Sequence, residues 1–128
     1  MEAKFEGGML TAAEAEIMTV VWQIGSVAVQ DIVERIPREL AYTTVMTTVR
    51  ILEEKGFLRQ AGKRGRAFLY EAAVDRESAS ESMTHEVARR LFGGSVKSLV
   101  LNLVKDDSIS GADLAEVKRI IEQLESKQ

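Results

Sequence analysis

The stretch AYTTVMTTVRILEEKG, residues 41–56, separates into two faces when it is wound as a helix. At about 100° per residue, the apolar side chains Val45, Met46, Val49 and Leu52 fall on one arc. The opposite arc carries threonines, with an arginine at its margin: Thr43, Thr44, Thr47, Thr48 and Arg50. An ordinary solvated helix face carries Glu, Lys and Gln, and threonine is a poor helix former. We therefore expect the threonine face to bind a partner.

A short basic hairpin follows this helix. Gly56 closes the helix after Lys55. The apolar runs 57–61 and 67–71 flank a glycine-rich loop at 62–65, which predicts two antiparallel strands. The tip carries three cations and no acid: Lys63, Arg64 and Arg66. Such a tip favours contact with phosphates or the minor groove of DNA over simple solvation.

Two more helices are predicted upstream. Thr11 and Glu14 have the spacing of a capping box and start the first helix, which ends at Gly25. The second runs from Val29 to Ile36 and stops at Pro37. Three helices and then a hairpin is the element order of a winged helix-turn-helix, whose recognition helix enters the major groove. There, short threonine hydroxyls would donate to phosphates and their methyl groups would contact thymine.

The second half of the chain is predicted to be helical and to dimerise. A helix capped by Asp75 reaches about Phe92 with a narrow apolar stripe, and an almost wholly apolar helix follows over 96–104. Ser110 caps a last helix with an apolar seam. Because the end of the chain is too short to cover this surface, we infer a second subunit. The residues expected at the interface are Leu99, Val100, Leu103, Leu114, Val117, Ile121 and Leu124.

The charge of the chain supports a nucleic-acid partner locally, although not overall. The 128 residues have a net charge of −3 and a pI of about 5.3. From Arg50 to Arg66, however, six cations stand against two acids, which gives a local net charge of +4. Phosphate contacts respond to local potential more than to total charge.

The composition excludes several kinds of chemistry. There is no cysteine and a single histidine, His85, so disulfides, thiolate sites and metal centres with several imidazoles are excluded. Glu81, His85 and Glu86 could form only a poor metal site, and a surface histidine is the better interpretation. Since no catalytic motif is found, we expect neither an enzyme nor a bound metal or cofactor.

The predicted fold is mainly α: an N-terminal winged helix-turn-helix of three helices and a β-hairpin, followed by a helical dimerisation region. Its expected parts are a flexible N-terminal arm (1–8), a DNA-binding domain (9–73) and a helical dimerisation domain (74–128). No apolar run reaches the ~20 residues that a membrane helix needs, and the polar N-terminus is unlike a signal peptide. We therefore expect a cytoplasmic protein with no direct membrane insertion.

The sequence resembles the BlaI/MecI-type penicillinase-repressor family from about Leu10 to about Leu124. The motifs that carry this resemblance are Leu10-Thr11-x-x-Glu14-x-x-Ile17-Met18-x-x-Val21-Trp22, Tyr42-Thr43-Thr44-Val45-Met46-Thr47, the helix end from Leu52 to Leu58, Gly65-Arg66-Ala67-Phe68-Leu69-Tyr70, Leu91-Phe92-Gly93-Gly94-Ser95 and Leu99-Val100. The resemblance implies a homodimeric transcriptional repressor that binds a palindromic operator in double-stranded DNA. Such repressors control β-lactamase-type resistance genes or other operons.

The resemblance also implies how repression is relieved. Family members are commonly paired with a membrane-bound sensor metallopeptidase, and the best-known ones are cleaved at an Asn-Phe bond in the dimer region. The matching position here is Asn102-Leu103, where leucine replaces the aromatic residue. A second departure is Ile51, where many relatives carry arginine; here the cation is Arg50. The cysteine cluster of the copper-responsive branch is absent from this sequence.

Two other functions fit the same fold. A regulator of another winged-helix family, relieved by a small ligand, would need a cavity between its helices, and the sequence offers no buried polar cluster for one. A winged helix used only for protein contact would not bind duplex DNA through its threonine face, even at low salt.

Overall fold

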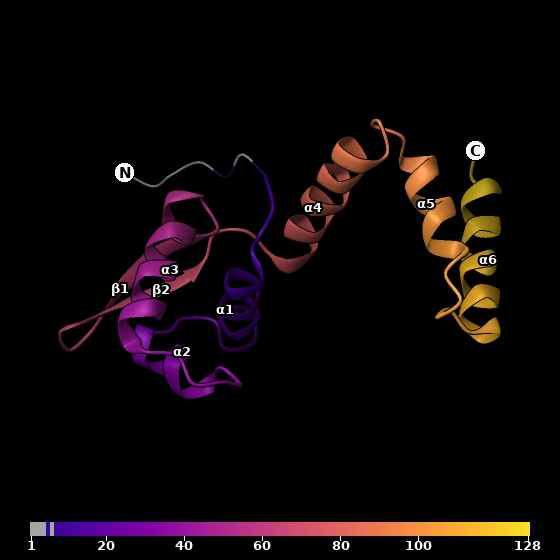
Figure 1. Ribbon diagram of the computed structural model, residues 1–128. Coiled ribbons are helices and arrows are strands. Elements are labelled where there is room, and N and C mark those ends of the chain that lie inside the picture. Colours follow the sequence, from indigo (N-terminus) through magenta and orange to yellow (C-terminus); the bar gives the residue numbers. More distant parts are fainter. Residues whose placement is uncertain (1–4, 6) are drawn as a thin grey trace. The chain divides into compact units, whose positions relative to one another are not determined.

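The computed structural model describes Phe5 and residues 7–128, which form six helices and one hairpin (Figure 1). In chain order the elements are α1 (Ala12–Ile24), α2 (Val29–Arg35), α3 (Tyr42–Glu54), β1 (Leu58–Arg64), β2 (Ala67–Ala72), α4 (Arg76–Leu91), α5 (Val96–Val104) and α6 (Gly111–Glu125). The predicted fold class, mainly helical with a two-stranded antiparallel hairpin, is confirmed. The chain divides into two compact units, Met1–Glu86 and Val87–Gln128.

The core of the first unit lies where α1, α2, α3 and the hairpin meet. The helix α1 contacts α2, α3 and β2, and α3 also contacts β1 (Figure 1). The side chains at its centre are fully buried and apolar: Ile17, Met18, Ile32, Val45, Val49, Leu52 and Phe57. Val27 bridges β2 at Tyr70 through two backbone hydrogen bonds of 2.7 and 2.9 Å, which fixes the hairpin against the start of α2.

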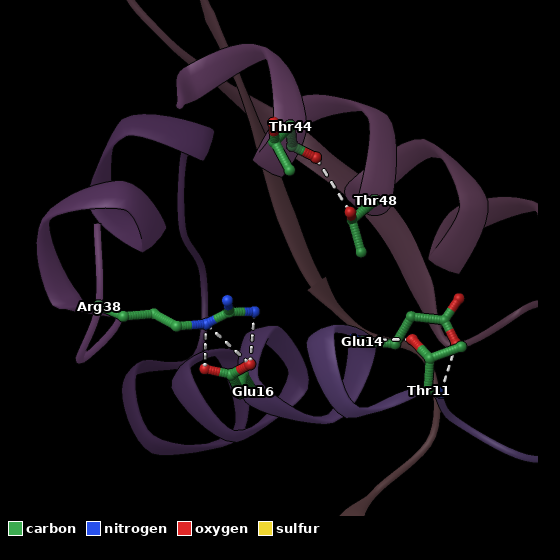
Figure 2. A network of polar contacts seen from close by, with 6 residues as sticks. All are labelled: Thr11, Glu14, Glu16, Arg38, Thr44 and Thr48. Atoms are coloured by element: carbon green, nitrogen blue, oxygen red, sulfur yellow. Dashed lines mark hydrogen bonds and ion pairs between the residues drawn. The ribbon is translucent and has the colours of Figure 1, made fainter. Parts of the chain in front are cut away.

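Capping determines where α1 begins. The Thr11 N–H donates to Glu14 Oε1 at 2.8 Å, and the Glu14 N–H donates to Thr11 Oγ1 at 3.2 Å (Figure 2). This reciprocal pair is the predicted capping box, so that expectation is confirmed. Farther along α1, Glu16 accepts two hydrogen bonds from Arg38 Nε, at 3.0 and 3.2 Å, and one from its Nη2 at 2.9 Å. These bonds tie the segment between α2 and α3 to α1.

The hairpin is longer than the sequence predicts. The expected loop at 62–65 is instead strand up to Arg64, which pairs with Ala67 across a tight turn. The pairing register shifts between Gln60 and Lys63, and Gly62 lies inside this bulge with φ of 104°. Glycine tolerates such a φ, so a residue that looked like part of a loop serves as a bulge within the strand.

The N-terminal segment and the start of α4 both belong to the first unit. The rings of Phe5 and Phe57 meet edge to face at 4.9 Å, and the Gly8 N–H donates to Ser82 Oγ of α4 at 3.3 Å. Residues 1–4 and 6 of the expected flexible arm lie outside the described residues. Ala79 of α4 is buried, and the compact unit ends within α4 at Glu86.

The second unit consists of the end of α4 together with α5 and α6. Each of the last two helices starts at a serine cap: the Ser98 N–H donates to Ser95 Oγ at 3.1 Å, and the Asp113 N–H donates to Ser110 Oγ at 3.0 Å. The apolar side chains of these helices are largely uncovered. Over the part of the chain that the structure describes, no helix has both the length and the apolar character needed to cross a membrane.

Candidate nucleic-acid interface

The helix α3 presents its two predicted faces to different surroundings. Val45, Val49 and Leu52 are fully buried, whereas Thr43, Thr44 and Thr47 are exposed and Thr48 is partly exposed. The apolar back is therefore held by the core, and the threonines form an open surface. Ile51 is also exposed on this side.

The hydroxyl groups of the later threonines are already hydrogen-bonded. Thr47 Oγ1 donates to the Thr43 carbonyl at 2.9 Å. Thr48 Oγ1 donates to the Thr44 carbonyl, also at 2.9 Å (Figure 2). This differs from the expectation that these hydroxyls donate to phosphates, because their single hydrogens bond the turn before. Their oxygen lone pairs and methyl groups remain for a partner. In the major groove those groups suit the amino hydrogens of adenine or cytosine and the methyl of thymine.

Half of the six cations between Arg50 and Arg66 are held by carboxylates. Nitrogen–oxygen distances are 2.8 Å for Lys55–Glu14, 2.7 Å for Arg59–Glu71 and 2.9 Å for Arg64–Asp31. The local charge of +4 thus overstates the potential available to a partner. Because these acids lie outside the segment 50–66 in the sequence, the local count omitted them.

The other three cations are exposed on α3 and at the hairpin tip. Lys63 is exposed, and its Nζ lies 4.8 Å from the centroid of the Phe68 ring, a contact that does not neutralise its charge. Arg50 and Arg66 are exposed, and neither forms an ion pair within the part of the chain that the structure describes. These three side chains therefore remain available to an anionic partner.

The hairpin tip is fastened to α2 through Arg64. Its Nη2 lies 2.9 Å from both carboxylate oxygens of Asp31, and Asp31 Oδ2 also accepts from the Ala28 N–H at 2.9 Å. The Arg64 guanidinium, and then the Ala28 N–H, hold the pKa of Asp31 below its usual value. In turn, the carboxylate raises the pKa of Arg64. Sequence reasoning missed Asp31, whose only local signal was its place in the first turn of α2.

A second ion pair fastens α3 to α1. Glu14 is 3% exposed, and its carboxylate accepts from Lys55 Nζ at 2.8 and 2.9 Å. Burial by itself raises the pKa of Glu14, but the hydrogen bonds from Lys55 and Thr11 outweigh it and hold the pKa below its usual value. The acid that caps the first helix therefore also fixes the end of the helix with the threonine face.

A cavity of about 140 Å³ lies between the start of α2, the start of α3 and the strand β2. Tyr42 and Phe68 line it and are both exposed, and Arg66 and Gln30 supply polar groups. Sequence reasoning missed Tyr42 as a surface residue. Its signal was its position directly before the first two threonines.

The residues expected in the second unit lie mostly on its surface. Asn102 and Leu103 are exposed on α5. The seam residues of α6 are also exposed: Leu114, Val117, Ile121 and Leu124. Val100 is exposed as well, but Leu99 is 6% exposed and is therefore already packed within the single chain. Around His85, as elsewhere among the described residues, no group of three or more His, Asp or Glu is placed to hold a metal ion.

Comparison with known proteins gives the family of the chain. The penicillinase repressor of Bacillus licheniformis is 27% identical over 121 residues, which cover 93% of this chain and 94% of that protein. The methicillin resistance regulatory protein MecI of Staphylococcus aureus (strain N315) is 25% identical over 114 residues, or 88% and 92% of the two chains. The solution structure of the DNA-binding domain of the repressor BlaI matches with a TM-score of 0.50 and 25% identity, covering 61% of this chain and 93% of that one. The sequence profile of penicillinase repressors matches residues 10–123, and the chain therefore belongs to the penicillinase repressor family.

Proposed function

We propose that this protein is a transcriptional repressor that binds operator DNA through α3 and the hairpin. The observation that carries the proposal is the open threonine face of α3, whose opposite side chains Val45, Val49 and Leu52 are fully buried, together with a hairpin tip that has exposed cations. The similarity to the DNA-binding domain of the repressor BlaI supports the same conclusion.

The two surfaces have different tasks on DNA. The face formed by Thr43, Thr44, Thr47 and Thr48 enters the major groove and discriminates between bases, because uncharged short side chains approach base edges closely. Arg50 enters the groove with these threonines. The hairpin cations Lys63, Arg64 and Arg66 contact phosphates, which contributes affinity on any sequence and makes that affinity depend on salt.

The repressor acts as a homodimer held together by the second unit. The apolar residues exposed on α5 and α6 form a surface that a second copy would cover: Val100, Leu103, Leu114, Val117, Ile121 and Leu124. Leu99 supports this surface from within its own chain. A symmetric dimer addresses a palindromic operator whose half-sites lie about one helical turn, ~34 Å, or a multiple of it, apart.

Relief of repression occurs by cleavage of the Asn102–Leu103 bond by a membrane-bound sensor metallopeptidase. The bond lies in α5, whose residues there are exposed, and a cut would separate α6 from the rest of the chain. Since dimerisation and operator binding are linked, the cut protein would release DNA at cellular concentrations. Incubation with the activated sensor should yield a fragment beginning at Leu103, and persistence of the intact chain would contradict this route.

Fluorescence anisotropy tests DNA binding directly. The purified repressor is titrated onto DNA from upstream of its own gene and onto scrambled DNA, between about 50 and about 200 mM salt. We expect selective binding with two subunits per site and a steep fall with salt. Weak, equal binding to both DNAs would contradict the assigned operator, and no binding even at low salt would contradict a DNA-binding function.

Two variants separate the proposed tasks. Arg66→Ala should weaken binding by a similar factor on both DNAs and reduce the salt slope by about 1. Thr47→Val keeps the shape of the side chain but removes the hydroxyl oxygen, so it should weaken binding to the operator about five- to thirtyfold and change binding to scrambled DNA little. If the two variants behaved alike, the division between base readout and phosphate contact would be wrong.

A further inference from the structure

One of the proposed phosphate-binding cations is already occupied in the free protein. Arg64 is the last residue of β1, and its Nη2 lies 2.9 Å from both oxygens of Asp31 on α2. The two side chains are 60% and 27% exposed, so the pair lies at the surface, where a partner can reach it. A guanidinium binds carboxylate and phosphate with the same donors and in the same planar geometry.

We propose that Asp31 is an intramolecular competitor of the DNA backbone, which occupies Arg64 in the free repressor and lowers its affinity for DNA of every sequence. The proposal rests on the DNA-binding function given above and adds a residue that sets its strength. When DNA binds, Arg64 exchanges the carboxylate for a phosphate. The ion pair gained is then offset by the one lost, and Asp31 is left with its negative charge beside the DNA.

The effect falls on affinity and not on sequence preference. Arg64 lies on the hairpin and is expected at the backbone, where contacts carry no direct sequence information. Asp31 therefore lowers binding to operator and to scrambled DNA by the same factor. Arg50 and Arg66 have no such competitor among the described residues, so they keep their full contribution.

Asp31 has a second, structural contact that the test must preserve. Its Oδ2 accepts from the Ala28 N–H at 2.9 Å and so supports the start of α2. Asparagine retains an acceptor oxygen for this hydrogen bond while removing the charge that holds Arg64. Asp31→Asn is therefore the variant of choice. Glu34→Gln is its matched control, because Glu34 lies one turn farther along the same helix and acts on Arg64 only through space, raising its pKa, while its carboxylate accepts a hydrogen bond from Gln30.

The experiment is a double-mutant cycle read by anisotropy on own-operator and scrambled DNA at one salt concentration. The proteins are wild type, Asp31→Asn, Arg64→Ala, the double variant and Glu34→Gln, each shown by circular dichroism to be folded. We expect Asp31→Asn to tighten binding to both DNAs about three- to fivefold. In the Arg64→Ala background the same change should have less than about a twofold effect, as should Glu34→Gln in the wild type.

The outcomes distinguish failure of this inference from failure of the proposed function. If Asp31→Asn weakens binding, the carboxylate positions Arg64 for DNA and the competitor proposal is overturned. An equal gain with and without Arg64 also overturns it, because the effect would then be general electrostatics. If wild type binds the operator selectively and Asp31→Asn changes nothing, only this inference fails. If wild type binds neither DNA, the proposed function fails with it.

Discussion

Replacing Glu14 should destabilise the first unit, because one carboxylate makes two separate stabilising contacts. Its carboxylate is buried between α1 and the end of α3, where it accepts from the Thr11 N–H at 2.8 Å and from Lys55 Nζ at 2.8 Å. Glu14→Ala removes both hydrogen bonds at once, together with a buried methylene group. Glu14→Gln retains an oxygen for the Thr11 N–H but removes the charge.

The contacts of Glu14 give the expected change in the free energy of unfolding for each variant. Loss of the capping hydrogen bond costs about 1 kcal/mol. Lys55 is 38% exposed, so water solvates its ammonium after the change, and the lost charged hydrogen bond costs about 1 kcal/mol rather than the larger value for a fully buried pair. The missing methylene adds about 0.8 kcal/mol. We therefore expect Glu14→Ala to cost about 3 kcal/mol and Glu14→Gln about 1 kcal/mol.

Urea unfolding of the full chain measures both values. All variants must be compared at one protomer concentration, because association with a second subunit would stabilise the folded state. The slope of the free energy against urea should stay constant, so that the midpoint reports stability alone. Lys55→Met is the reciprocal variant: it leaves a buried carboxylate without its cation and should cost about 2 kcal/mol.

Two results would refute this reasoning. If Glu14→Ala and Glu14→Gln cost the same, neither the capping hydrogen bond nor the methylene group would contribute anything beyond the charge. If Lys55→Met were neutral, the contact at 2.8 Å would be a surface pair without energetic consequence, and α3 would be held by its apolar back alone.

The pH dependence of stability, the Trp22 hydrogen bond and the surface of α6 can each be tested. The pKa of Glu14 is held below its usual value of 4.5. Its contribution to stability is therefore present above that value and is lost as the pH falls through the lower, folded-state pKa. In an acid titration, the free energy of unfolding of the wild type should fall more steeply than that of Glu14→Gln. Trp22→Phe removes the Nε1–H donor to the Val74 carbonyl at 2.9 Å and should cost about 1 kcal/mol in urea. Ile121→Asp, at a side chain 45% exposed on α6, should shift dimer to monomer in sedimentation without destabilising the monomer, whereas Gln123→Asp on the same helix should not.

Local signals in the sequence predicted most of the elements. The capping box at Thr11 and Glu14 acts over three residues, and it marks the start of α1 correctly. The two faces of α3 follow from helical spacing alone, and the structure buries Val45 and Val49 as expected. The order of helices and hairpin was also predicted correctly, because most boundaries depend on glycine, proline or a cap within one turn.

The ion pairs could not be predicted in the same way. Lys55 and Glu14 are 41 residues apart, and Arg64 and Asp31 are 33 apart. Such pairs depend on how the elements pack, and periodicity carries no information about that.

The hairpin turn was misplaced for a different reason. Gly62 and Gly65 both have positive φ, and the sequence does not distinguish a glycine in a bulge from one in a turn.

The pairing of the cations changes what kind of DNA-binding protein this chain can be. An acidic chain with six unpaired cations on one face would bind any DNA strongly. Base contacts would then add little to its affinity for the operator over other DNA. With Lys55, Arg59 and Arg64 each held by a carboxylate, the sequence-independent term is smaller. In the function proposed above, selection of the operator would then depend on the uncharged threonine face and on joining two subunits. Weak binding elsewhere in the genome increases the share of repressor that reaches its site.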